Sequence, residues 1–143
     1  MMRTYIAGPM RNIPEFNFPA FHRAATYLRK RGHEVFSPAE SDLEKHGEDI
    51  SKGNANGDES EAAKAYGFDR REAMGRSLAW ICEHADAIAL LPGWKESSGA
   101  CAEFMVARAL GLKMFSLELC AHGFGDPANC PTCQHFEAVR AAE

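Results

Sequence analysis

Apolar and polar residues alternate along the chain in blocks that predict strands followed by helices. Short, mostly apolar runs predict four strands, at residues 3–8, 33–38, 86–92 and 113–119. Apolar residues at helical spacing predict three helices, at residues 16–32, 69–85 and 97–111. The run 86–92 is apolar almost throughout, which is typical of a parallel strand covered on both faces. The pattern therefore predicts an α/β fold with a three-layer parallel sheet of the flavodoxin or Rossmann type.

Local signals set the expected ends and faces of two helices. In the helix 16–32, Asn17 is expected to be the N-cap, with Pro19 in the first turn and Gly32 just past the end. In the last helix, the residues expected to form the core face are Ala102, Met105, Val106, Ala109 and Leu110. Glu103 lies beside that face, and its side chain is expected to point back toward the helix start.

Residues 41–66 break the alternation. They are rich in Gly, Asn and Ser, show little periodicity, and contain seven acidic residues against three lysines, which accounts for the net charge of −4. We therefore expect a long, mobile acidic loop, which is either a lid over a site or a plain surface insertion. One domain is expected over residues 1–119, followed by a Cys- and His-containing tail over 120–143.

Composition narrows the classes of function. A chain of 143 residues with 45% hydrophobic and 25% charged residues is typical of one soluble domain. A net charge of −4 argues against a nucleic-acid polymer as partner. The apolar runs are far shorter than the roughly 20 residues that span a bilayer, and the N-terminus lacks the apolar core of a signal peptide. We expect a cytoplasmic protein without membrane contact.

Three segments should meet at the carboxyl ends of the predicted strands, where ligands bind in open parallel sheets. They are Gly8–Arg11, Pro38–Ser41 and Pro92–Gly99. Glu103 follows one turn into the last helix, where it either complements the helix dipole or faces this crevice as a functional acid. Ser97 and Ser98 are candidate N-caps, and the same helix start is a natural anion site.

Three stretches of sequence carry a resemblance to a known family. They are YIAGPMR (5–11), FNFPAFHRAATYLRKRGHEVFSPAE (16–40) and ADAIALLPGWKESSGACAEFMVARALG (85–111). They resemble small, often phage-borne members of the nucleoside 2-deoxyribosyltransferase superfamily, from Tyr5 to about Phe115 except for the 41–66 segment. The most specific block is W-x-x-S-x-G-A-x-x-E, here Trp94 to Glu103. The resemblance implies the superfamily's α/β fold and cleavage of an N-glycosidic bond.

The resemblance also implies roles for the matching residues. Glu103 matches the nucleophile that attacks C1′ of a 2-deoxyribosyl group, as a carboxylate does in retaining glycosidases. Tyr5 matches the tyrosine that orients this carboxylate, and Gly8 lets the backbone approach the ligand closely. Water or a second base then resolves the glycosyl-enzyme ester. No cofactor is required for this chemistry.

Ser97 matches a position that separates two branches of the superfamily. Transferases acting on free nucleosides carry an acid there, whereas 2′-deoxynucleoside 5′-monophosphate N-hydrolases carry a serine that donates to the phosphate. The serine therefore favours a deoxynucleoside 5′-monophosphate as the substrate. The residues expected to bind it are Gly8, Pro9, Met10, Arg11, Ser97, Ser98, Gly99 and Asp86, the last with a mainly structural role as the alternative.

One position departs from the family's pattern. An aspartate thought to assist at the base or the sugar is replaced here by Ser77, and Asp69 is a candidate substitute. Three functions therefore stay open: a nucleotide N-hydrolase, a 2-deoxyribosyltransferase, and a non-catalytic protein that binds or sequesters a nucleotide. Ser97 favours the first over the second. The resemblance also implies a homodimer.

The C-terminal tail contains a separate candidate site. Its C-x-x-C pair, with another cysteine and histidines nearby, provides the ligand types of a tetrahedral zinc site. The expected ligands are Cys120, Cys130, Cys133 and His135, with unliganded thiols as the alternative. A zinc ion bound there is expected to be structural.

Overall fold

The chain forms a five-stranded sheet in the computed structural model, which describes residues 1–117 and 139–140. The strands are β1 (Arg3–Ala7), β2 (Glu34–Phe36), β3 (Ala87–Leu90), β4 (Lys113–Ser116) and β5 (Val139–Arg140). Their order is β2-β1-β3-β4-β5, in which the first four are parallel and β5 runs antiparallel to β4. The predicted parallel sheet is confirmed, and β5 adds an edge strand from beyond the predicted limit of the domain.

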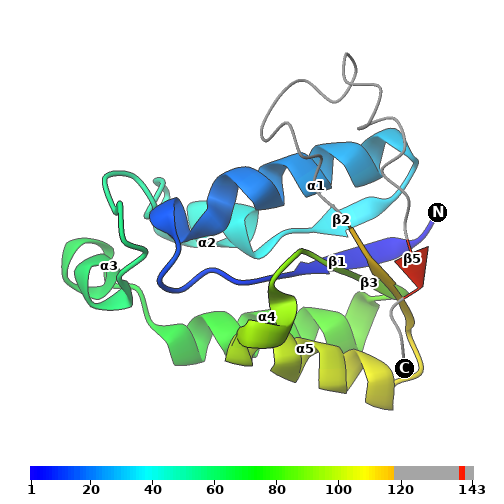
Figure 1. Cartoon of the computed structure of the whole chain (residues 1–143). Helices are drawn as coiled ribbons and strands as arrows, with labels where there is room; N and C mark the ends of the chain where they lie inside the picture. The colour runs from blue at the N-terminus through cyan, green and yellow to red at the C-terminus, as the bar shows by residue number, and fades with distance from the viewer. Residues whose placement is uncertain (118–138, 141–143) are drawn as a thin grey trace.

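Helices cover both faces of this sheet and make three layers (Figure 1). The helices are α1 (Phe18–Lys30), α2 (Pro38–His46), α3 (Glu59–Tyr66), α4 (Arg70–His84) and α5 (Ser98–Ala109), with short 3₁₀ turns η1 (Pro14–Asn17) and η2 (Trp94–Glu96). The first two lie on one face, α4 and α5 lie on the other, and α3 lies beyond the carboxyl ends of the strands. Over the described residues, no helix has the length and apolar character needed to cross a bilayer.

Two apolar clusters hold these layers together. The larger packs α1 on the sheet through Phe18, Phe21 and Leu28, and the smaller packs α4 and α5 on the other face through Ile81 and Phe104. The side chains of β3 are buried along the whole strand, as its continuous apolar run predicts. The fixed sheet places the ends of β1 and β3 side by side, because these two strands are hydrogen-bonded neighbours.

The expectation of a long loop over 41–66 is wrong, because two helices occupy much of this segment. Pro38 begins α2 instead of only ending the preceding strand, and Gly47, which has φ 71°, is the C-cap that follows the last helical residue, His46. Asp58 caps α3 by accepting a hydrogen bond from the Ser60 amide at 2.8 Å. Both helices are short and polar, so their apolar spacing is weak, although their capping residues do carry a signal.

The start of α1 also differs from the prediction. Asn17 precedes the helix, but it has φ 60° and its side chain caps no amide. Its Nδ2 instead donates to the Pro9 carbonyl at 3.0 Å. This bond ties the beginning of α1 to the turn that follows β1.

The expected core face of α5 is wrong as well. Met105 and Leu110 are 57% and 49% exposed. The residues that pack inward are Ala100, Glu103, Phe104 and Ala107. Because α5 is small and apolar nearly all round, spacing alone does not distinguish the face that contacts the sheet. Glu103 consequently lies within the buried face instead of beside it.

Residues 12–17 pass close to residues 54–57. The Asn12 amide donates to the Gly57 carbonyl at 2.9 Å, and the Glu15 amide donates to the Asn54 carbonyl at 3.0 Å. Gly57 has φ 62°, and a Cβ added to it would lie 2.2 Å from the Ile13 carbonyl oxygen. Only glycine therefore fits where these two segments cross.

Gly57→Ala is expected to lower the free energy of unfolding by about 3 kcal/mol, because its methyl group would force the two segments apart. Gly53→Ala is the matched control, since Gly53 has φ 77° but nothing within 4 Å of an added Cβ. Gly53→Ala should lose only about 1 kcal/mol, which is the cost of holding an alanine in the left-handed conformation. Denaturant unfolding of both variants measures the difference, and equal losses would contradict the close crossing.

Candidate active site

A cavity of about 380 Å³ lies beyond the carboxyl ends of β1 and β3. The turn after β1 lines it with Gly8–Asn12, and the start of α5 lines it with Glu96–Ala100 and Glu103. Other lining residues come from α2 and α4, namely Pro38, Ser41, Asp42, Ala73, Met74, Arg76 and Ser77. The three segments that were expected to converge at this edge of the sheet therefore do so.

Glu103 and Tyr5 form a buried polar pair at this cavity. Glu103 lines the cavity and is 8% exposed, and Tyr5 is fully buried in β1. The Tyr5 hydroxyl donates to Glu103 Oε1 at 2.7 Å. The Tyr5 ring stacks on Phe36 and packs on Trp80, which fixes the direction of the hydroxyl. The structure thus brings together two residues that the resemblance pairs.

The surroundings of this pair shift its proton equilibria. Burial raises the pKa of Glu103 to about 8, and the hydrogen bond from Tyr5 acts in the opposite direction. The protonated form of Glu103 is therefore favoured at pH 7. Burial also raises the pKa of Tyr5, which keeps its hydroxyl a donor. A buried carboxyl with a strongly raised pKa in a cavity is typical of a functional group.

The start of α5 forms one end of the cavity. Ser97 is its N-cap, since its Oγ accepts a hydrogen bond from the Ala100 amide at 3.2 Å. Ser97, Ser98 and Gly99 line the cavity together with the turn Gly8–Arg11. Helix amides, hydroxyl groups and the Arg11 guanidinium at one place suit an anionic group.

Gly8 has a packing reason in addition to its place in the cavity. A Cβ on Gly8 would lie 2.8 Å from the Leu91 Cβ. The turn after β1 therefore lies directly against the end of β3 because position 8 has no side chain. This close contact brings Pro9, Met10 and Arg11 to the cavity.

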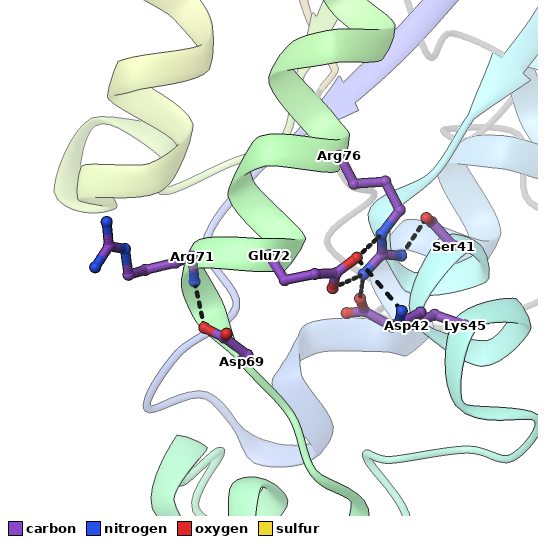
Figure 2. Close-up of polar contacts among 7 residues, drawn as sticks. All are labelled: Ser41, Asp42, Lys45, Asp69, Arg71, Glu72 and Arg76. Atoms are coloured by element: carbon purple, nitrogen blue, oxygen red, sulfur yellow. Dashed lines mark hydrogen bonds and ion pairs between the residues drawn. The ribbon is translucent and has the colours of Figure 1, made fainter.

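A second polar cluster, which the sequence analysis missed, lies on the wall formed by α2 and α4 (Figure 2). Arg76 Nη2 donates to Asp42 Oδ1 at 3.2 Å and to Glu72 Oε2 at 3.0 Å, and Arg76 Nη1 donates to the Ser41 hydroxyl. Asp42 is 5% exposed. Burial raises its pKa to about 6, although Arg76 acts to lower it. The contacts from Arg76 to α2 join residues 34 and 35 positions apart, so no local sequence pattern predicts them.

Two predicted or candidate carboxylates lie elsewhere. Asp86 is not in the cavity, contrary to the prediction that it binds the substrate, because it lies at the opposite end of β3. There it accepts a hydrogen bond from the Arg3 amide at 2.8 Å and forms an ion pair with the Arg3 guanidinium at 3.2 Å. Asp69 is the exposed N-cap of α4 and accepts from the Arg71 amide at 2.9 Å, outside the cavity lining (Figure 2). Ser77, by contrast, is buried in the cavity wall, where its hydroxyl acts to lower the pKa of Tyr5.

The predicted zinc ligands Cys120, Cys130, Cys133 and His135 lie outside the described residues. Within residues 1–117, no group of three or more His, Cys, Asp and Glu side chains is arranged to hold a metal ion. In the same part of the chain Cys82 and Cys101 are free thiols.

The comparisons with known proteins identify a family. A family described as a domain of unknown function (DUF4406) matches residues 2–116, which include every residue that lines the cavity. No curated protein and no solved structure matches the chain.

Proposed function

The chain belongs to this DUF4406 family, and we propose that it hydrolyses the N-glycosidic bond of a 2′-deoxynucleoside 5′-monophosphate with Glu103 as the nucleophile. The observation that carries the proposal is the buried Tyr5–Glu103 hydrogen bond at the cavity. Among the described residues, only burial and the hydrogen bond from Tyr5 shift the pKa of this carboxyl. Such a group is suited to meet a carbon that becomes positively charged, because no cation of the described residues competes for its charge.

The proposed reaction has two displacement steps at one carbon. Tyr5 holds Oε1 of Glu103, so Oε2 is the oxygen that attacks C1′. The bond from C1′ to the base breaks, its electron pair leaves with the base, and a glycosyl ester forms on Glu103. Water then attacks C1′, breaks the ester and releases 2-deoxyribose 5-phosphate. The hydrogen bond from Tyr5 stabilises the Glu103 carboxylate, which is present before the first step and forms again after the second.

The place of Ser97 supports a nucleotide substrate. Six helical positions separate Ser97 from Glu103, which corresponds to about 9 Å along the axis. Because the Glu103 side chain points back toward the helix start, one nucleotide can contact both ends of this distance. The 5′-phosphate would receive hydrogen bonds from the serine hydroxyls and helix amides, while C1′ faces Glu103.

Ser97→Asp is expected to weaken the use of nucleoside monophosphates by about 10- to 100-fold in kcat/KM, because the added carboxylate repels the phosphate. Aspartate is as good an N-cap as serine, so α5 should be preserved. Ser97→Asn is the matched control, since asparagine caps equally well without a charge. Kinetics on a nucleotide and on its nucleoside measure the effect. Equal loss for Ser97→Asp and Ser97→Asn would exclude a phosphate at this position.

Base release is the direct test of the proposed function. The protein is incubated with each 2′-deoxynucleoside 5′-monophosphate and with the matching nucleosides, and free base is separated and quantified. Release from the nucleotides supports hydrolysis, and transfer to an added second base would indicate the transferase instead. A non-catalytic nucleotide-binding protein is favoured by one observation, the mostly protonated state of Glu103 at pH 7. Tight nucleotide binding without release would establish that alternative. The homodimer and the cytoplasmic location stay predictions.

A further inference from the structure

The cavity contains two carboxyl groups with raised pKa values on different walls. Glu103 comes from α5, and Asp42 comes from α2. Both are buried and both line the cavity. Asp42 contributes to the raised pKa of Tyr5, whereas the pKa of Glu103 depends on burial and Tyr5 alone. The two carboxyls therefore act on the same tyrosine, and neither shifts the pKa of the other.

Arg76 sets the position of the Asp42 carboxyl. Its guanidinium contacts Ser41 and Asp42 on α2 and Glu72 on α4, which fixes the two helices relative to each other (Figure 2). The single contact between Arg76 and this carboxyl, an ion-paired hydrogen bond of 3.2 Å, reaches Oδ1. Among the described residues Oδ2 is not a buried atom without a partner, and we take it as the oxygen that meets a ligand.

The position of Asp42 matches the base end of a nucleotide. In the proposed binding mode the phosphate lies at the start of α5 and C1′ lies at Glu103. The base then extends away from the phosphate into the rest of the cavity, where the wall formed by α2 carries Asp42. Apolar side chains of the same cavity, Phe16, Ile50, Phe68 and Met74, provide surfaces on which a flat ring can pack.

We propose that Asp42 is the general acid and base of this reaction, an inference that rests on the proposed function. In the first step Oδ2–H donates its proton to the base as the bond from C1′ to the base breaks, which leaves Asp42 as a carboxylate and the base neutral. In the second step the Asp42 carboxylate takes a proton from the water that attacks C1′. The proton balance closes, and no further reactant is needed. Arg76 acts on Asp42 as a positioning residue.

The surroundings of Asp42 are consistent with this cycle. Burial and the nearby Glu72 favour the protonated form of Asp42, whereas Arg76 and His46 favour its carboxylate. The balance of these effects is a pKa of about 6 for Asp42. Tyr5 on β1 stays neutral because burial raises its pKa. A group poised near neutral pH can both give and take a proton. In this proposal Asp42, on α2, takes the place of the family's aspartate, which is replaced by Ser77 in this chain.

Asp42→Asn is the test, because asparagine keeps the size of the side chain and can still accept from Arg76. On the natural deoxynucleotide that the wild type cleaves best, this variant should lose about 10²- to 10⁴-fold in kcat. On 7-methyl-2′-deoxyguanosine 5′-monophosphate, whose base leaves without a proton, single-turnover release of the base, which reports the first step alone, should fall by less than about tenfold. Glu44→Gln, an exposed residue on the same helix, is the control and should match the wild type on both substrates.

The pH profile is a second readout that does not need the methylated analogue. Glu103 must be ionised to attack, and Asp42 must be protonated to donate its proton. Wild-type kcat/KM should therefore rise with pH up to about pH 6, stay level up to about pH 8 and fall at higher pH. Asp42→Asn removes one of these two requirements. Its lower activity should rise up to about pH 8 and then stay level.

Each outcome separates the two proposals. If Asp42→Asn loses the same factor on both substrates and keeps the alkaline fall, Asp42 is structural and only this inference is overturned. If the variant is as active as the wild type on the natural nucleotide, the inference is likewise overturned while the proposed function stands. If the wild type releases no base from any nucleotide, the proposed function fails and the inference fails with it.

Discussion

Glu103→Gln should reduce base release from the preferred nucleotide by at least about 10³-fold. An amide oxygen is too weak a nucleophile to form the ester at C1′. Glutamine keeps the length of the side chain and can still accept the hydrogen bond from Tyr5, so the cavity should keep its shape. Single-turnover release of the base measures the loss, and calorimetric titration of the nucleotide should give an affinity within about threefold of the wild type.

The control for this substitution is Glu83→Gln, an exposed carboxyl of α4 that is not among the residues lining the cavity. It changes the net charge by the same amount and should leave both release and binding unchanged. If Glu103→Gln and the wild type released base at equal rates, Glu103 would not be the nucleophile. If nucleotide binding were lost as well, the substitution would have disturbed the cavity, and the affinity would report this directly.

The same substitution should change the pH dependence of stability by about 3 kcal/mol between pH 5 and pH 8. The pKa of Glu103 is about 8 in the folded protein against 4.5 for an ordinary glutamate. The folded state therefore binds this proton more tightly than the unfolded state does. Stability falls as the pH rises from about 4.5, and the loss is complete a little above pH 8. Glutamine does not titrate, so the stability of Glu103→Gln relative to that of the wild type should increase steadily as the pH rises through this range.

Denaturant unfolding of the wild type and Glu103→Gln at several pH values measures this difference. Asp42 contributes a similar loss at lower pH, since its pKa rises from 3.8 to about 6, but both proteins retain it. Their difference therefore isolates Glu103. Parallel stability curves from pH 5 to pH 8 would show that Glu103 is already ionised in the folded protein.

Much of the fold and one end of the site follow from patterns within short windows. The apolar run of β3 and the helical spacing of α1 identify elements that pack on the sheet without help from distant residues. The carboxyl ends of parallel strands meet at one edge, so Gly8–Arg11 and Ser97–Gly99 converge once the strands are identified. Tyr5 and Glu103 are 98 residues apart, and only the resemblance paired them in advance.

The remaining features depend on tertiary contacts that no window contains. Arg76 and Asp42 are far apart in the sequence, and Asp42 lies on α2, a helix whose polar sequence resembles that of a loop. In α5, apolar residues occur on every side, so the contact with β3 and not the spacing decides that Glu103 faces inward. Asp86 opens β3, so it lies at the opposite edge of the sheet from the cavity, and its expected place among the binding residues came from the resemblance alone.

The wall that carries Asp42, Ile50 and Glu59 comes from one uninterrupted stretch, residues 38–66, inserted between β2 and α4. Glu103, the proposed nucleophile, and the start of α5 come from other parts of the chain. Under the proposed function, a change within residues 38–66 alone would therefore alter which base is released and leave Glu103 and the proposed phosphate site unchanged. Sequence differences within this family should therefore be most frequent in residues 38–66. Gly57 should be an exception, because a side chain there would collide with the backbone of Ile13.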